Sequence, residues 1–426
     1  MKFQKISSFN LHFSLFISAF FIFQIFPFYP LYFHISALSS HSIARYLLLY
    51  LLAYVIFRTW KSQDILQNSM TNIAIALFVV TQSLSAIAAM NWVSFIELAN
   101  RFMFGIIIYV VGCYFLKSKR AVWIMLLSLF ASIVIITIYQ FIIFFYPSQF
   151  NRYLLPILYE PYLEVIDNYY ALNKLFVDIF NPAFGALILF LFYFYRNIVK
   201  RVGLIVLFGS LIFFSIVSNF RTHALMLITS VMSELFILFR GRGKIPVVMV
   251  LMGIAMISIA TFNLISQTTI DRLFLPTISD YATLSSRTEM WALSTEMGLS
   301  SPLFGVGIGN FYDNFPNKKI FKNSLIDWKN AEERVVIIDP HNIFFSTFAQ
   351  TGFLGLFALI FMLFTFIKND IQFFKENDLM FTTISICFWS LFLYSLLNPA
   401  ISLQYLTLYW VLRASLNSHK GALLKK

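Results

Sequence analysis

The chain has 426 residues, of which 59% are hydrophobic and 12% are charged, and its formal net charge at pH 7 is +12. This composition excludes an ordinary water-soluble domain, because such a domain would expose large apolar patches to water. The two cysteines, Cys113 and Cys387, lie in apolar stretches as small apolar residues and indicate no disulfide framework. The sequence is therefore that of an integral membrane protein.

Apolar windows long enough to cross a membrane recur along almost the whole chain. A helix needs about 17 to 25 mostly apolar residues to cross the hydrocarbon core. Twelve such windows cover residues 12–33, 43–58, 72–90, 101–117, 121–146, 177–195, 203–219, 223–239, 245–265, 343–367, 379–396 and 400–415. None of them alternates apolar and polar residues, so the predicted fold is an all-α integral membrane protein with about 12 transmembrane helices. We expect the first window to be a retained span, and residues 1–426 to form a single polytopic membrane domain.

The basic residues predict the orientation of these helices, since short cytoplasmic loops retain Lys and Arg. If the N-terminus is cytoplasmic, every loop on the cytoplasmic side is basic. The residues concerned are Arg58, Lys61, Lys117, Lys119, Arg120, Arg196, Lys200, Arg201, Arg240, Arg242, Lys244, Lys368 and Lys375 in the loops, Lys2 and Lys5 at the start, and Arg413, Lys420, Lys425 and Lys426 at the end. We therefore expect a multi-pass protein of the bacterial inner (cytoplasmic) membrane with both termini cytoplasmic. This topology and attraction to anionic membrane lipid account for the net charge, so no nucleic-acid partner is expected.

Two sizeable segments then lie outside: 147–176, rich in Tyr and Pro, and 266–342, the long periplasmic loop between the ninth and tenth predicted helices. A loop as long as the second is uncommon unless it is functional. It also argues against a two-halved transporter, whose longest connection is expected inside, where this chain has only "RNIVKRV". Ionisable residues that could couple transport are sparse, with Asp178, Glu234 and Arg101 near the ends of predicted spans.

Three stretches bring chemically useful side chains to the outer face. After the seventh span, "SNFRTHALML" contains Arg221 and His223. The long loop contains "LSSRTEMWALSTEMGLSSPLFGVGIGNF", with Arg287, and closes with His341 in "DPHNIFFSTFAQTGFLG". Arginine is a permanently charged, forked donor suited to phosphate, and histidine is a base near neutral pH. These residue types predict a site on the periplasmic face.

The residues that follow His341 have a helical pattern. At 100° per residue, Gly352 and Gly355 lie within about 40° of His341 on one helix face. Glycines on that face are expected to let another helix come close. Pro340 suits the first helical turn, and Asp339 suits a cap or the positive end of the helix dipole. The sequence therefore predicts a closely packed helix whose outer end presents the histidine.

These residues resemble those of a known family. His341 and Asn342, followed after nine residues by the run Gly352 to Gly355, are similar to the H-[N/S/Q]-x9-G-x-x-G pattern of bacterial O-antigen ligases. The stretch "RTHAL", which begins at Arg221, looks like their R-x3-L element. "SSRTEMW" followed by "SPLFGVGIGNF" is similar to the segment that precedes the histidine across the wider ligase and polymerase superfamily. The resemblance covers roughly residues 205 to 365.

The resemblance implies a metal-independent glycosyltransferase with no cofactor. It implies a donor glycan on undecaprenyl diphosphate and an acceptor hydroxyl on the periplasmic face, with lipid A core as the leading acceptor. A growing glycan or a protein remains open as the acceptor. In this scheme Arg221 and Arg287 bind the diphosphate, and His341 activates the hydroxyl. The residues expected in supporting roles are His223, Asn342, Gly352 and Gly355.

Other interpretations remain open at this point. An O-antigen polymerase would use the same donor and two arginine-bearing external loops, and the 147–176 segment does contain Arg152. A lipid-linked glycan flippase or transporter is a third hypothesis, which charges lining the bilayer interior would favour. An arginine at a span end can be a topology residue, and Arg287 can pair with Glu289 or Asp280 on the loop surface.

Overall fold

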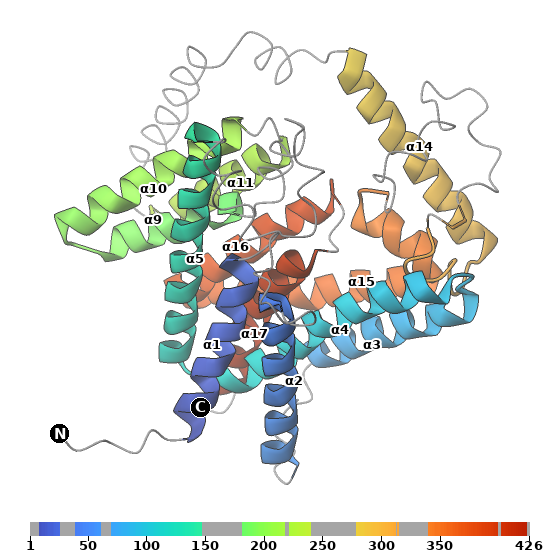
Figure 1. Ribbon diagram of the computed structural model, residues 1–426, viewed down its shortest axis with the longest axis horizontal. Helices are drawn as coiled ribbons and strands as arrows, with labels where there is room; N and C mark the ends of the chain where they lie inside the picture. The colour runs from blue at the N-terminus through green and yellow to red at the C-terminus, as the bar shows by residue number, and fades with distance from the viewer. Residues whose placement is uncertain are drawn as a thin grey trace.

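The computed structural model of the chain describes residues 8–25, 39–60, 70–146, 181–217, 221–239, 278–311, 313–314, 340–398 and 402–423. Within these residues the architecture is all-helical (Figure 1). The helices are α1 (Ser8–Ile25), α2 (Ser40–Thr59), α3 (Met70–Leu84), α4 (Trp92–Phe115), α5 (Lys119–Phe145), α9 (Gly185–Phe194), α10 (Ile198–Val217), α11 (Arg221–Leu238), α14 (Ile278–Ser300), α15 (Ile343–Glu376), α16 (Leu379–Ser395) and α17 (Leu403–Leu423), with the 3₁₀ helices η1 (Ser85–Ala88) and η4 (Asn181–Phe184).

The predicted spans can be compared with these helices. Every predicted span overlaps a helix except 245–265, which lies outside the described residues. By length and composition, six helical segments of the described chain could cross a membrane: Ser42–Thr59, Met70–Ala88, Trp92–Phe115, Lys119–Ile142, Ile198–Ser215 and Ile343–Glu376. Four shorter apolar helices accompany them: Leu11–Ile25, Asn181–Phe194, Thr222–Leu238 and Leu379–Ser395. The all-helical, multi-pass architecture is thus confirmed, and α14 is a helix inside the loop that the sequence left without structure.

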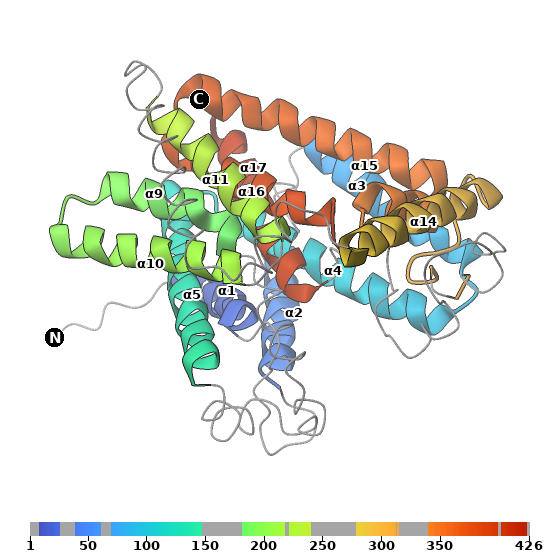
Figure 2. The same ribbon diagram turned by 90° about the horizontal axis from the view of Figure 1, so that it is seen from above.

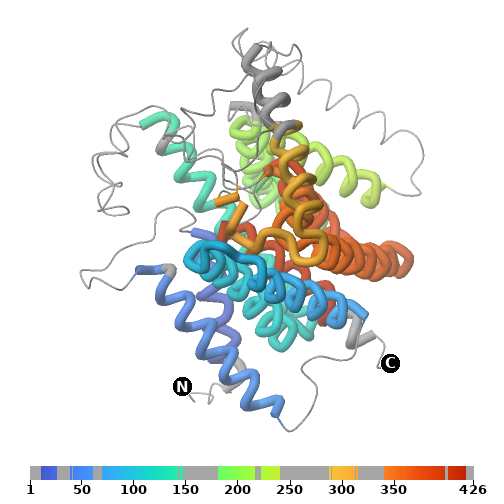
Figure 3. The backbone as a smooth tube through the Cα atoms, turned by 90° about the vertical axis from the view of Figure 1, so that its right-hand side faces the viewer, coloured from blue at the N-terminus to red at the C-terminus, as the bar shows by residue number. Residues whose placement is uncertain are grey.

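The helices form two groups around a central one. α17 lies in the middle and packs against α4 and α16 (Figure 1). α15 is the longest helix; it runs beside α3, and α14 crosses it near its N-terminal end (Figure 2). Figure 3 views the molecule from the side of α3, α4 and α14. The other group contains α9, α10 and α11, which reaches the centre through contacts between α11 and α16.

Two hydrogen bonds join connections that the predicted topology places on the same side of the membrane. On the predicted cytoplasmic side, the Lys119 ammonium at the start of α5 donates to a carboxylate oxygen of Asp378 before α16, at 2.6 Å. On the predicted periplasmic side, the side-chain amide of Asn310 donates to the carbonyl of Asn91 before α4, at 3.1 Å. Loops that are expected to share a side are therefore in contact.

Arg413, which the sequence places among the basic residues of the cytoplasmic end, is fully buried within α17. Its guanidinium Nη1 lies 2.8 Å from Oδ1 of Asp370 on α15. The second oxygen of Asp370 accepts from Ser385 Oγ at 3.0 Å and from Trp389 Nε1 at 2.9 Å, both on α16. Arg413 also donates from Nη2 to Oδ1 of Asn417 at 2.9 Å. The helix bundle thus contains a buried ion pair that the sequence did not indicate, because Asp370 lies just beyond the end of one apolar window and Arg413 near the end of another.

Candidate active site

His341 lies in a tight turn immediately before α15. Its φ is 55°, in the left-handed region that few non-glycine residues adopt. The side-chain Oδ1 of Asn342 caps the helix by accepting from two backbone N–H groups of the first turn, at 2.9 and 3.3 Å. The prediction that Pro340 lies in the first helical turn is therefore wrong, and Asp339 lies outside the described residues. Strained backbone of this kind costs about 1 to 3 kcal/mol and is concentrated at functional sites.

Contacts from two other elements hold this turn. The side-chain amide of Asn342 donates to the carbonyl of Leu396, at the end of α16, at 3.1 Å. Trp291 on α14 donates from its indole Nε1 to the carbonyl of Pro340 at 3.0 Å. The same indole stacks on Phe345, with ring centroids 5.3 Å apart and planes at 7°. The backbone on both sides of His341 is thereby fixed.

Arg287 lies on α14 one helical turn before Trp291, so both side chains are on the same face of that helix. Burial first, and the positive charge of the Arg287 guanidinium second, together lower the pKa of His341 to about 4. His341 is therefore a neutral imidazole at physiological pH, close enough to Arg287 to feel its charge. The side chains of Glu289 and Asp280, the alternative partners for Arg287, lie outside the described residues.

Arg221 is the first residue of α11, and its side chain lies outside the described residues. The start of α11 is nevertheless linked to the turn that contains His341, called the histidine turn below. Asn398 donates from its side-chain amide to Oγ1 of Thr222 at 3.0 Å. Two residues earlier, the carbonyl of Leu396 accepts the bond from Asn342. The connection between α16 and α17 therefore joins the start of α11 to the start of α15.

His223 occupies different surroundings. Its side chain is buried and lines a small polar pocket with residues of α5, η4 and α10: Gln140, Asn181, Pro182, Leu211, Phe214 and Ser215. None of these neighbours comes from α14 or α15, so its predicted supporting role would be exerted through the start of α11. Within the described residues, no group of three or more His, Cys, Asp or Glu side chains could hold a metal ion.

Gly352 breaks α15, with φ 65° and ψ −163°. The carbonyl of Ala349, which the break leaves without its helical partner, accepts from the N–H of Val306 at 2.9 Å. Beyond the break, the N–H of Phe353 donates to the carbonyl of Pro302 at 2.7 Å. A Cβ on Gly352 would lie 2.5 Å from that same oxygen. The prediction that this glycine admits a neighbouring helix is therefore wrong: its neighbour is the turn formed by residues 302–311, called the glycine turn below.

Gly355 also has another role than the one predicted. A Cβ there would collide with the side chain of Thr351, whose hydroxyl donates to the carbonyl of Thr347 at 2.6 Å. The close approach between helices occurs instead at Gly298 on α14, where a Cβ would lie 2.5 Å from the ring of Phe348 on α15. The glycine pattern indicates close packing correctly but assigns it to the wrong partners.

The site thus combines the turn that holds His341, the helix α14 that carries Arg287, and the helix α15 that is broken at Gly352. The family model described as O-antigen ligase matches residues 179–360. Over these residues the chain is similar to O-antigen ligases. A comparison with curated proteins gives no match. The matched residues include every site residue predicted from the sequence, from Arg221 to Gly355. Because the matched domain is shared by O-antigen ligases and polymerases, it indicates a membrane glycosyltransferase-type enzyme that uses lipid-linked glycans in general terms.

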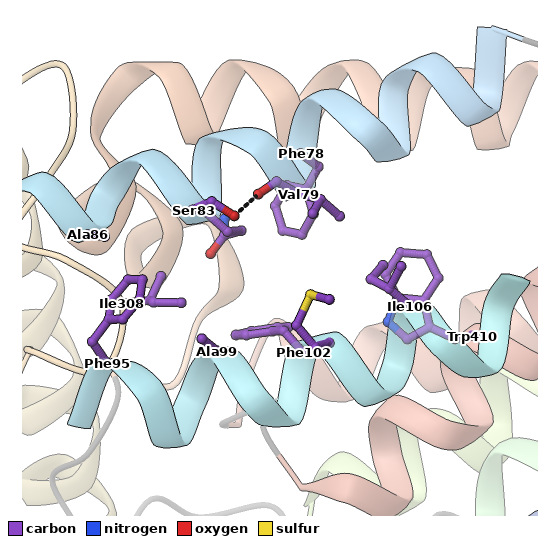
Figure 4. Close-up of a pocket in the computed structure, with 12 residues that line it drawn as sticks. Phe78, Val79, Ser83, Ala86, Phe95, Ala99, Phe102, Ile106, Ile308 and Trp410 are labelled. Atoms are coloured by element: carbon purple, nitrogen blue, oxygen red, sulfur yellow. Dashed lines mark hydrogen bonds between the residues drawn. The ribbon is translucent and has the colours of Figure 1, made fainter. Parts of the chain in front are cut away.

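A largely apolar groove runs between α3 and α4 and reaches Ile308, within the matched residues (Figure 4). Its cavity has a volume of about 170 Å³. Ile308 of the glycine turn lies at one end and Trp410 of α17 at the other, with Phe78 and Phe102 on opposite walls. These side chains make a surface suited to a hydrocarbon chain.

The groove continues into a smaller cavity next to the histidine turn. The two cavities share Phe78, Gln82, Phe102 and Ile308. The smaller one adds polar side chains from the first turns of α15 and from the connection after α16: Ser346, Thr347, Gln350 and Asn398. An apolar surface thus leads to polar groups on the first turns of α15, the helix that follows His341.

Sequence reasoning missed three residues that build this site. Trp291 stands four residues after Arg287, a helical spacing that could have revealed it once α14 was expected. Gln350 joins the site to the glycine turn, since its Oε1 accepts from the N–H of Gly309 and its Nε2 donates to Ser346 Oγ, both at 2.7 Å. Asn398 has no local signal, because its bond to α11 depends on the tertiary structure.

Proposed function

We propose that the protein transfers a glycan from undecaprenyl diphosphate to an acceptor hydroxyl at the periplasmic face, with lipid A core as the acceptor. The observation that carries this proposal is the histidine turn: a neutral imidazole in a strained turn, within the field of a guanidinium, among the residues that match the O-antigen ligase family. A neutral imidazole can accept a proton, and a guanidinium can stabilise a departing phosphate.

The reaction assigns one task to each group. As the acceptor oxygen bonds to the anomeric carbon, His341 takes the hydroxyl proton. The bond between that carbon and the diphosphate oxygen breaks, and the electron pair leaves with the carrier. Arg287 and Arg221 stabilise the negative charge that accumulates on the diphosphate. The imidazolium then returns its proton to water.

Donor binding also prepares the base. Arg287 lowers the pKa of His341 in the free enzyme. A diphosphate beside Arg287 offsets that positive charge, so the pKa of His341 rises when the donor is bound. A base is most effective when its pKa approaches the working pH, so His341 gains strength at the moment it is needed.

The apolar groove supports a lipid-linked donor. Its walls, from Phe78 to Trp410, suit the polyprenyl chain, and it ends at polar side chains of the first turns of α15, the helix that follows His341. The buried pair of Arg413 and Asp370 gives no support to a flippase or transporter, because each charge is satisfied by the other and by α16 or α17.

A polymerase is the second candidate, because the matched domain is shared with polymerases. Segment 147–176, which would supply its second arginine, lies outside the described residues. A lipopolysaccharide gel of a deletion strain separates the two. Loss of all O-antigen-bearing bands is the expected ligase result, whereas core carrying a single repeat points to the polymerase. An unchanged band pattern, with the gene's expression verified in the parent strain, would overturn both.

A further inference from the structure

The two halves of α14 are attached to the rest of the protein in different ways. In its C-terminal half, Met290, Leu293 and Met297 are buried in a cluster with Val306, Phe311 and Ala349. Its N-terminal half carries Arg287, and Trp291, just past the middle of the helix, contacts the histidine turn one helical turn from Arg287. Figure 2 shows α14 crossing the N-terminal end of α15. Loss of the Trp291 contacts would therefore loosen the arginine-bearing half while the other half stays docked.

Trp291 makes two different contacts with the segment that holds the histidine. Its N–H bonds the carbonyl of Pro340, the residue before His341. Its ring lies flat on Phe345, four residues after His341, with planes at 7°. A hydrogen bond fixes direction and a stacked ring fixes separation, so together they determine how α14 is oriented against the turn.

We propose that Trp291 is a positioning residue that fixes the Arg287 guanidinium relative to the His341 imidazole. Arg287 is one helical turn away on the same face, so its position follows the orientation of the indole. The catalytic consequence rests on the proposed function, but the geometric one does not.

Among the described side chains, few charged groups lie on the elements packed around His341. α14 contributes Arg287, whose charge acts on the imidazole. The connection from Leu396 to Asn398 is uncharged. α11 begins with Arg221, whose side chain lies outside the described residues, and His223 faces the pocket with α5 and α10. A change in the separation of Arg287 and His341 should therefore change the pKa of His341, which a titration measures.

The direct test is the titration of His341 by NMR, in full-length protein labelled at histidine and held in lipid nanodiscs. The His341→Gln spectrum assigns the signal. Wild-type His341 is expected to titrate near pH 4. Trp291→Phe keeps a ring over Phe345 but removes the N–H donor; its His341 should titrate at least about one pH unit higher, toward the ordinary 6.5, because Arg287 moves away and water enters.

Trp389→Phe is the matched control. It removes an indole N–H bond of similar length, 2.9 Å to Asp370, at a distant point of the bundle. It should leave the His341 titration unchanged. Phe345→Leu keeps the indole hydrogen bond but removes the stacked ring, so it should also raise the pKa of His341. This variant provides the test if Trp291→Phe fails to accumulate. An unchanged titration in both variants overturns the inference, whether or not the protein proves to be a transferase.

A transfer assay distinguishes positioning from simple damage. Its donor is undecaprenyl-diphosphate-linked glycan extracted from the deletion strain. If His341 titrates near 6.5 in Trp291→Phe, kcat/KM relative to wild type should fall up to about tenfold further at pH 5.5 than at pH 8. An equal loss at both pH values would show that Trp291 does not act through the histidine.

Discussion

The two ends of α15 hold charged residues in opposite ways. Near its C-terminal end, Asp370 and Arg413 attract each other at 2.8 Å, and both are satisfied by neighbouring side chains. At its N-terminal end, a neutral His341 is held within the field of the positively charged Arg287, in a left-handed turn. An ion pair needs no further counter-charge, whereas a positive charge that keeps a neighbouring histidine neutral is offset by an anion. The first arrangement suits a structural clamp, and the second suits a phosphate-binding site.

The largest effect is expected at the histidine. His341→Ala should lower turnover by roughly 10²- to 10⁴-fold while carrier binding survives, because it removes the base and leaves both arginines. The measurement is transfer from purified undecaprenyl-diphosphate glycan, with chelator present throughout. Loss of wild-type transfer in chelator would contradict the metal-free scheme, and wild-type turnover by His341→Ala would reduce the residue to an interfacial anchor.

Substitution of Arg287 should have the next largest effect. Arg287→Ala removes the charge that stabilises the leaving diphosphate, so we expect a loss of roughly 10²- to 10³-fold. Arg287→Lys keeps a point charge without the forked geometry and should retain more activity. We expect the same order at Arg221. Arg101 is the matched control, because it forms an exposed pair with Glu97 at 2.6 Å, and Arg101→Ala should change transfer little.

Substitutions in the buried pair of Arg413 and Asp370 should lower stability and leave transfer nearly unchanged. Arg413→Met leaves Asp370 buried and unpaired, which costs about 3 to 5 kcal/mol of stability. The double change of Asp370→Leu with Arg413→Met should recover most of that loss, because no uncompensated charge remains. Thermal unfolding in detergent measures both. Transfer per folded molecule is expected to be nearly normal, and a loss as large as that of His341→Ala would mean that the clamp is part of the active site.

The smallest expected effect is on the pH dependence of kcat/KM in the wild-type enzyme. A histidine with a lowered pKa of about 4 stays neutral at pH 5, so kcat/KM should change little between pH 7 and 5. It should fall only as the pH approaches 4, where the base becomes protonated. The kcat profile should fall at a higher pH, because the bound diphosphate offsets Arg287. Profiles that coincide at 6.5 would contradict the effect of Arg287 on His341.

Sequence patterns were sufficient where the information is local. The apolar windows predicted the helices, and the spacing from His341 to Gly355 predicted the family. They failed where a partner is distant. Arg413 lies at the end of an apolar window and therefore resembles a cytoplasmic anchor. Its neighbours in the sequence give no sign that it pairs with Asp370 on another helix.

The same limit applies to the glycines and to α14. Gly352 has the spacing of a helix-packing residue, yet its positive φ depends on a turn some fifty residues earlier in the chain that binds the released carbonyls. α14 is of mixed polarity, so hydropathy did not mark it, and Trp291 could be recognised only with Pro340 and Phe345 in place. The candidate residues were therefore predictable, whereas the contacts that orient them were not.

The nine residues between Asn342 and Gly352 have a mechanical meaning. They form a helical strut about 14 Å long, at 1.5 Å per residue, tied at one end to Leu396 and at the other to the glycine turn. Adding or removing one residue would rotate His341 by about 100° relative to that turn. In this chain the spacing of the motif thus fixes both the distance of the imidazole from the glycine turn and the direction in which it points.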